Sequence, residues 1–171
     1  MASTSQNVSI ASCSCGGVQL EAVGAPIVGA VCYCDDCQAG ARQIEALPNA
    51  APVRGRDGGT AYLLYRRDRV TCTKGASLLK NLKLKGSSVT NRVVATCCNS
   101  AMYVGFDKGP FWYSVYRARF KGNAPGLEMR LQTKHLPKGV QLPGDMPNYS
   151  AFPIKLAVKL VFARIAMLFG R

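Results

Sequence analysis

Acidic residues and histidine are scarce in this sequence. Nine Asp and Glu oppose 22 Lys and Arg, which gives a formal net charge of +13, and the chain has one histidine. So basic a chain favours an acidic partner, such as nucleic acid, a membrane surface or an anionic metabolite. Many of the bases fall in residues 54–92. The alternative for them is solvated strand faces that keep the protein in solution.

The chain also lacks the patterns of a secreted or membrane-spanning protein. Residues 1–10 contain neither a basic residue nor a continuous apolar run, the two parts of a secretory signal peptide. The most apolar segment, residues 152–169, is interrupted by three bases and is shorter than the roughly 20 apolar residues that span a bilayer. We therefore expect a cytoplasmic protein, with membrane association confined to this last segment.

The length of 171 residues fits one domain with an appendage. Most of the chain consists of short β-branched or alternating runs separated by Gly, Pro and Asn, which is typical of antiparallel β domains. We predict strands over residues 17–22, 27–33, 60–65, 69–73, 78–84, 89–96, 102–106, 111–116 and 128–133. The sequence thus predicts a mainly β domain over residues 1–150 and one C-terminal α-helix within residues 151–171.

The predicted terminal helix has apolar side chains that must be covered. At about 100° per residue, Lys155 and Lys159 share a face and Arg164 lies nearly opposite, so the helix is imperfectly amphipathic. Three placements remain open: packing on the domain, contact with a second subunit in a homodimer, or a position at a membrane surface.

Eight cysteines in a chain without a secretory pattern favour metal or redox chemistry over disulfides. Cys32, Cys34 and Cys37 are close in sequence, and cysteines two or three residues apart on a tight turn can aim their sulfurs at one ion. Asp35 and Asp36 between them are expected to form the turn or to accept hydrogen bonds around the site. We predict one zinc ion at these three cysteines.

A second zinc site would draw on two parts of the chain. Cys13 and Cys15 precede a glycine turn, and Cys97 and Cys98 are the obvious source of further thiolates. Adjacent residues on an extended strand point to opposite faces, so both reach one ion only if the backbone turns there. Asn99 favours such a turn because it tolerates the left-handed conformation. Cys98 is the safer ligand of the adjacent pair.

Cys72 and His135 stand apart from these groups. An isolated cysteine among strand residues is typically a small buried hydrophobe. A single loop histidine is typically exposed, with a zinc-ligand or proton-carrier role as the alternative. We include neither residue among the metal ligands.

The cysteine motifs resemble the family of glutathione-dependent formaldehyde-activating enzymes and centromere protein V. The family's Cys-x-Cys-Gly is matched by residues 13–16, and its Cys-His-Cys-x-x-Cys by residues 32–37, where Tyr33 replaces the histidine. Its Cys-x-x-Cys-Gly-Thr knuckle is similar to residues 95–100, where Ala95 stands at the first cysteine. The Cys-Cys-Asn-Ser sequence at residues 97–100 looks most like that of an uncharacterised bacterial branch of this family.

The resemblance implies a β-tent, an assembly of antiparallel sheets stapled by a structural zinc on Cys13, Cys15 and the Cys97-Cys98 turn. It also implies a second zinc on Cys32, Cys34 and Cys37 as the catalytic group, because three thiolates leave a fourth position open. The implied activity is that of a carbon–sulfur lyase or synthase. It would join glutathione or another small thiol to formaldehyde or another small aldehyde, as S-(hydroxymethyl)glutathione synthase does.

A second hypothesis needs no open zinc position. Both zincs would be scaffolding, the basic strands would bind a polyanion, and the terminal helix would dock on a membrane surface or a protein partner. The sequence carries no strong nucleic-acid signal, because its aromatic residues lie in β runs where core packing explains them. We favour the enzyme hypothesis over this binding module.

Overall fold

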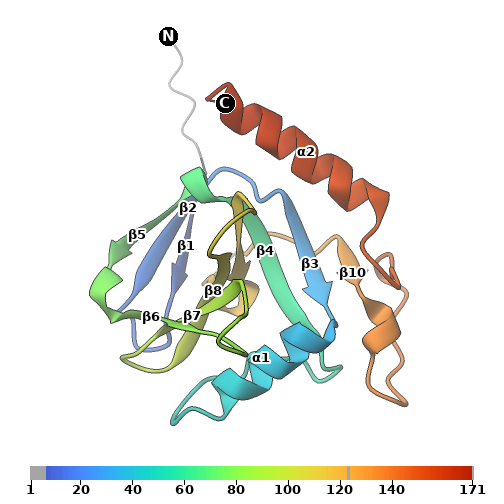
Figure 1. Ribbon diagram of the computed structural model, residues 1–171, viewed down its shortest axis with the longest axis horizontal. Helices are drawn as coiled ribbons and strands as arrows, with labels where there is room; N and C mark the ends of the chain where they lie inside the picture. Colours follow the sequence, from blue (N-terminus) through green and yellow to red (C-terminus); the bar gives the residue numbers. More distant parts are fainter. Residues whose placement is uncertain (1–6, 123, 171) are drawn as a thin grey trace.

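The computed structural model describes residues 7–122 and 124–170, and Figure 1 shows their arrangement. Residues 1–6, on which part of the signal-peptide expectation rests, lie outside the described residues. The strands are β1 (Val8–Ser12), β2 (Gln19–Val23), β3 (Val28–Cys32), β4 (Thr60–Arg66), β5 (Val70–Lys74), β6 (Leu79–Leu82), β7 (Thr90–Ala95), β8 (Ser100–Phe106), β9 (Trp112–Tyr116) and β10 (Met129–Leu131). The α-helices are α1 (Asp35–Glu45) and α2 (Ile154–Leu168).

The strands form two sheets. β1, β2 and β5 make a three-stranded antiparallel sheet, and the larger sheet has the order β10-β3-β4-β9-β8-β7-β6. Its neighbouring strands run antiparallel, except that β10 pairs in parallel with β3. Each of the nine predicted strands matches an observed one with its ends shifted by a residue or two, so the mainly β prediction is confirmed. β1 was missed.

The larger sheet is buried on both faces because its strands alternate two sets of apolar side chains. On β4, Leu63 and Tyr65 belong to the core shared with the three-stranded sheet, where Leu20 also lies. Tyr62 and Leu64, the alternate residues, belong to a second core on the side of the helices. The molecule thus has one core on each side of its central sheet.

α1 was also missed by the sequence analysis. Cys34 is its N-cap, and Asp35 and Asp36 occupy its first turn. Acidic side chains are favoured there because they oppose the positive end of the helix dipole. The two aspartates expected to form a turn therefore open a helix. Its buried residues are Gly40, Ala41 and Ile44.

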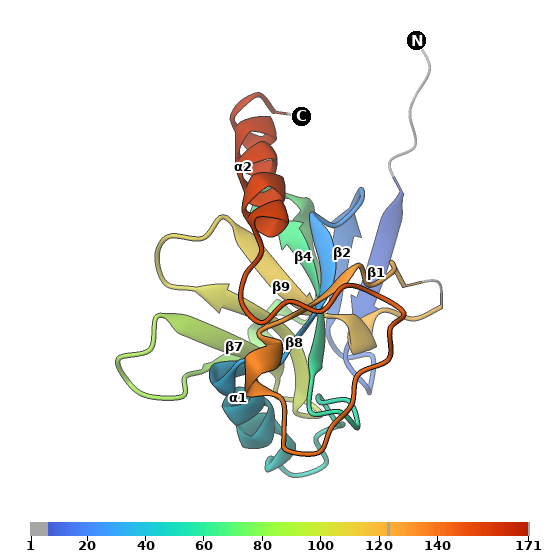
Figure 2. The same cartoon turned by 90° about the vertical axis from the view of Figure 1, so that its right-hand side faces the viewer.

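α2 packs against the body with one side near its N-terminal end, and its C-terminal part extends beyond the ends of the strands (Figures 1 and 2). Leu156 is 5% exposed and belongs to the helix-side core, and Lys159 donates to Glu128 at 2.6 Å. Packing on the domain, one of the three placements left open by the sequence, is therefore observed for this side. The other side exposes large apolar side chains: Ile154, Val158, Val161, Phe162, Ile165 and Leu168. Among the described residues, no helix has both the length and the apolarity to cross a bilayer.

Candidate metal centres

Four cysteines from the β1–β2 turn and the β7–β8 turn meet in one group. The sulfurs of Cys13, Cys15, Cys97 and Cys98 all lie within 4.8 Å of one another. Cys13 Sγ is 3.6 Å from Cys15 Sγ and 3.8 Å from Cys97 Sγ, and the Cys15 and Cys97 sulfurs are 3.3 Å apart. A tetrahedral zinc with Zn–S bonds of about 2.3 Å separates its sulfurs by about 3.8 Å. This four-cysteine group therefore fits a four-thiolate metal site.

The backbone turn that brings Cys97 and Cys98 together is present. Asn99 has a φ of 52°, in the left-handed region, and the N–H of Cys98 donates to the Ala95 carbonyl at 3.2 Å. The turn predicted from Asn99 is thus confirmed, and both adjacent thiols reach the group. Gly17 leaves room for them, because a Cβ there would lie 3.1 Å from Cys97 Sγ.

A buried polar network supports the four-cysteine group. Ser100, which is fully buried, donates to Ser14 Oγ at 2.9 Å, and Arg119 donates to both hydroxyls at 3.0 and 3.2 Å. Ser100 Oγ is also 3.1 Å from Cys98 Sγ. Burial raises the pKa of Cys98, but hydrogen bonds from Ser100 and Cys15 outweigh it and lower the pKa to about 6. Cys98 is therefore prepared to bind metal as a thiolate at neutral pH.

Three cysteines form a second group where β3 is followed by α1. The sulfurs of Cys32, Cys34 and Cys37 lie within 4.8 Å of one another, and Cys34 Sγ accepts from the Cys37 N–H at 3.4 Å. Hydrogen bonds from the Cys32 and Cys37 thiols, with those from the backbone of the first helical turn, lower the pKa of Cys34. The hydrogen bond with Cys34 raises the pKa of Cys32, and burial adds to the shift, while a hydrogen bond with Cys37 opposes it. Cys34 is thus the thiol of this three-cysteine group that ionises most readily, and its place at a helix N-terminus favours the thiolate.

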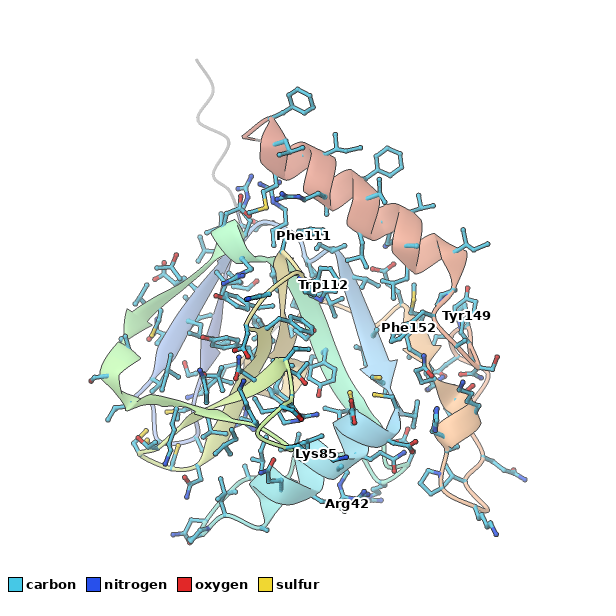
Figure 3. The ribbon with its side chains drawn as sticks, in the orientation of Figure 1. Arg42, Lys85, Phe111, Trp112, Tyr149 and Phe152 are labelled. Carbon is cyan, nitrogen blue, oxygen red and sulfur yellow. The ribbon has the colours of Figure 1, made fainter. Side chains whose placement is uncertain are left out.

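The three-cysteine group forms part of the wall of a cavity of about 530 Å³. The cavity lies between the larger sheet, α1 and the C-terminal segment, and Figure 3 labels Trp112 and Phe152 on its lining. The apolar residues that the sheet contributes are Ala30, Leu64, Val104, Phe106, Trp112 and Leu131. The three cysteines therefore line a ligand-sized space that is mostly apolar.

Arg92 is a site residue that the sequence analysis missed. It is 3% exposed, lines the cavity and donates from Nη2 to the Asp36 carbonyl. Its Nη1 has no hydrogen-bond partner among the described residues. Gly40 leaves room for the Arg92 side chain, because a Cβ at residue 40 would lie 1.6 Å from Arg92 Nε. The signal in the sequence was a charged residue inside a strand that is otherwise buried.

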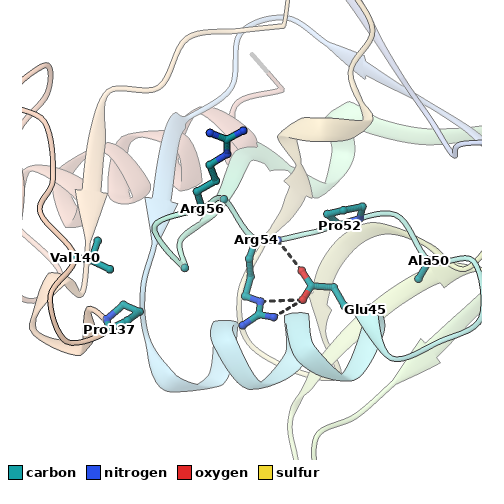
Figure 4. Close-up of a pocket in the computed structure, with 9 residues that line it drawn as sticks. Glu45, Ala50, Pro52, Arg54, Arg56, Pro137 and Val140 are labelled. Carbon is teal, nitrogen blue, oxygen red and sulfur yellow. Dashed lines mark hydrogen bonds and ion pairs between the residues drawn. The ribbon is translucent and has the colours of Figure 1, made fainter.

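A second pocket, of about 580 Å³, lies beside the C-terminal end of α1 (Figure 4). Its Arg54 is held by Glu45, with Nε 2.9 Å from Oε2 and the backbone N–H 2.9 Å from Oε1. Lys83 in the same basic region pairs with Asp107 at 2.5 Å. Part of the positive charge of residues 54–92 is therefore engaged in internal ion pairs rather than presented to an anion.

Tyr33, His135 and Cys72 lie outside both cysteine groups. The buried Tyr33 hydroxyl donates to Asp57 at 2.5 Å, and burial, reinforced by that carboxylate, raises its pKa. His135 Nδ1 is 3.0 Å from Asp35 Oδ2, a partner that the sequence did not reveal. Cys72 is half-buried on β5. All eight cysteines are free of disulfides.

Comparison with known proteins finds the cysteine pattern in one family. The model of the family described as glutathione-dependent formaldehyde-activating enzyme matches residues 8–51, a stretch that includes Cys13, Cys15 and the three-cysteine group but not the β7–β8 turn. A solved structure of a Rhodobacter sphaeroides protein is similar with a TM-score of 0.49 and 17% identity, over 81% of this chain and 98% of that chain. No curated protein matches. The resemblance to the glutathione-dependent formaldehyde-activating enzymes is thereby confirmed for residues 8–51.

Proposed function

We propose that the chain binds zinc at both cysteine groups and that the three-cysteine group catalyses the reversible addition of a small thiol to an aldehyde. One observation carries this proposal: Cys32, Cys34 and Cys37 converge within 4.8 Å on the wall of a cavity. The four-cysteine group already has the complete ligand set of a structural zinc. Residues 1–150 form the zinc domain in this proposal, and residues 151–171 are an addition to it.

Zinc bound to the three-cysteine group would supply Lewis acidity that favours the thiolate form of a bound thiol. The chain's own residues would orient the reactants. Cys32 fixes the group to β3 and Cys34 to the start of α1, so the sulfurs stand on two rigid elements. Leu64 and Trp112 on the opposite lining keep water away from the reacting atoms.

The reaction balances without a redox partner. The thiol sulfur forms a bond to the carbonyl carbon, the carbon–oxygen π bond breaks, and the thiol proton ends on the former carbonyl oxygen. Asp35, Asp36 and His135 are the candidate proton carriers. Asp36 lines the cavity, whereas Asp35 pairs with His135. We therefore assign proton transfer to the Asp36 carboxylate.

A kinetic screen of zinc-loaded protein tests the proposal. Glutathione and other small thiols are mixed with formaldehyde and small aldehydes, and adduct formation is followed by NMR. We expect adduct formation faster than in buffer, lost in Cys34→Ser and retained in Cys72→Ser, because Cys72 lies in neither group. Rates equal to those in buffer for every pair of reactants would reject the enzyme proposal.

A second function, attachment to an anionic membrane surface, is favoured by α2. Val161 and Phe162 are 58% and 67% exposed in the middle of its apolar side. Lys155 and Arg164 flank that side, and residues 146–171 contain no acidic residue. Such a basic, apolar face suits anionic lipid, whereas a second copy would bring like charges together.

Vesicle binding tests this attachment. We expect the protein to sediment with anionic vesicles and not with zwitterionic ones, and Phe162→Ser to weaken the binding. Thr71→Ser, on an exposed position of β5 away from α2, serves as the control. A concentration-dependent doubling of mass without vesicle binding would assign the face to a second copy instead.

A further inference from the structure

The cavity beside the three-cysteine group is walled on one side by the C-terminal segment. Six residues of that segment line it: Phe152, Pro153, Ile154, Leu156, Ala157 and Leu160. Leu156 is buried in the core, whereas Phe152 and Ile154 are 64% and 83% exposed. The segment therefore runs from the floor of the cavity to its rim. None of these residues lies in the stretch that matches the family model.

The lining offers few polar partners to a ligand. Besides the cysteines, its side chains with polar atoms are those of Asp36, Tyr62, Thr90, Arg92, Trp112 and Ser114. Among the described lining residues Arg92 is the one cation; its Nη2 is already bound to the Asp36 carbonyl, so its Nη1 is the donor left for a ligand. A ligand with several charged and amide groups would lose its water there without replacing those hydrogen bonds. Each polar group that is buried without a partner therefore opposes binding.

We infer that this cavity selects a substrate with an apolar body, an aryl or alkyl group borne by the thiol or the aldehyde, over the tripeptide glutathione. For the reacting thiol or aldehyde group, this inference rests on the proposed function. For the body of the substrate, it rests on the residues that line the cavity. Glutathione has two carboxylates, whereas Arg92 is the one cation among the described lining residues. An aryl or alkyl group instead removes apolar surface from water against the sheet and α2.

Trp112 provides a direct optical reporter. It is the single tryptophan of the chain, and its side chain lines the cavity (Figure 3). Its fluorescence in the zinc-loaded full-length chain can be titrated with three probes: benzyl mercaptan, glutathione and benzyl alcohol. We expect benzyl mercaptan to bind at least about tenfold more tightly than glutathione, because its ring removes apolar surface from water in the cavity. Benzyl alcohol, which carries no thiol, should also bind.

Two neighbouring residues of α2 give a matched pair of variants. Leu160 lines the cavity and Val161 is exposed on the other side of the helix. We expect Leu160→Gln to weaken benzyl mercaptan binding by about fivefold or more, since it places an amide in the apolar wall, and Val161→Gln to leave it unchanged. Ala157→Phe, which adds a ring at an exposed lining position, should also weaken binding without disturbing the core.

The outcomes separate this inference from the proposed function. Glutathione binding as tightly as benzyl mercaptan, or equal binding in Leu160→Gln and Val161→Gln, would overturn the selectivity for an apolar body. Benzyl alcohol binding that persists in Cys34→Ser would support it independently of the zinc. Tight binding of both aryl probes without turnover of any thiol–aldehyde pair would leave the cavity inference standing and reject the enzyme proposal.

Discussion

The two cysteine groups differ in their number of thiols and in what surrounds them. The four-cysteine group joins two turns, and its cysteines are backed by a network of Ser14, Ser100 and Arg119. The three-cysteine group joins a strand end to a helix start and borders an apolar cavity. Under our proposal, the first arrangement would complete a metal site from within the protein. The second would supply three ligands beside a space for substrate, which is the arrangement expected of a reactive zinc site.

The largest expected effect separates the two groups by stability. Cys13→Ser should remove a structural zinc and most of the stability of the fold, because small zinc domains gain about 10–16 kcal/mol of apparent binding free energy from their metal. Cys34→Ser should keep a cooperative thermal unfolding transition and lose only the second metal. Differential scanning calorimetry and elemental analysis check both variants. Equal loss of stability in the two would make both groups structural.

A smaller effect is expected from the network behind the four-cysteine group. Ser100→Ala should destabilise the protein by about 1–3 kcal/mol, because the buried Arg119 guanidinium and the N–H of Ser14 lose an acceptor. Urea unfolding measures the change. Ser88→Ala is the matched control, since its hydroxyl accepts one exposed hydrogen bond from the Lys85 N–H. If Ser88→Ala lowers the free energy of unfolding as much as Ser100→Ala does, the network does not stabilise the protein more than an exposed hydrogen bond does.

The smallest expected effect concerns the helix that carries the three-cysteine group. Burial raises the pKa of Glu45, but hydrogen bonds from Arg54 and the Val53 N–H outweigh it and hold the pKa below 4.5. Because the folded pKa is the lower one, this pair stabilises the protein above that pH, and its contribution is lost as the pH falls through the folded pKa. Glu45→Gln should therefore cost less than about 1 kcal/mol at pH 7, and the cost should shrink below pH 4.5.

Unfolding by urea at several pH values measures that dependence, with Glu21→Gln on β2 as the control. A difference between wild type and Glu45→Gln that stays constant across the acidic range would contradict the role of the Arg54 pair.

Most of the strands were predictable from short apolar or alternating runs, and β4 is an example of an apolar run. Tyr62 and Leu64 belong to one core and Leu63 and Tyr65 to the other, so the run is apolar throughout and reads as a buried strand. β1 was missed because its apolar residues, in the sequence Val-Ser-Ile-Ala-Ser, are few and small.

α1 was missed because its sequence signal is weak. Its buried surface consists of two small residues and Ile44, so no apolar stripe announces a helix. The cap is a cysteine, Cys34, instead of one of the usual capping residues. The cysteine groups themselves were predictable from spacing. The cavity was not, because it needs Arg92, Trp112 and Leu160 brought together by the fold.

Cadmium NMR of the cadmium-substituted protein tests the central claim, that the three-cysteine group keeps a coordination position for substrate and the four-cysteine group does not. We expect two resonances, one lost in Cys34→Ser and the other lost in Cys15→Ser. Added thiol should shift the resonance that depends on Cys34 and leave the other unchanged. A thiol that shifts neither resonance, or only the one that depends on Cys15, would contradict the account.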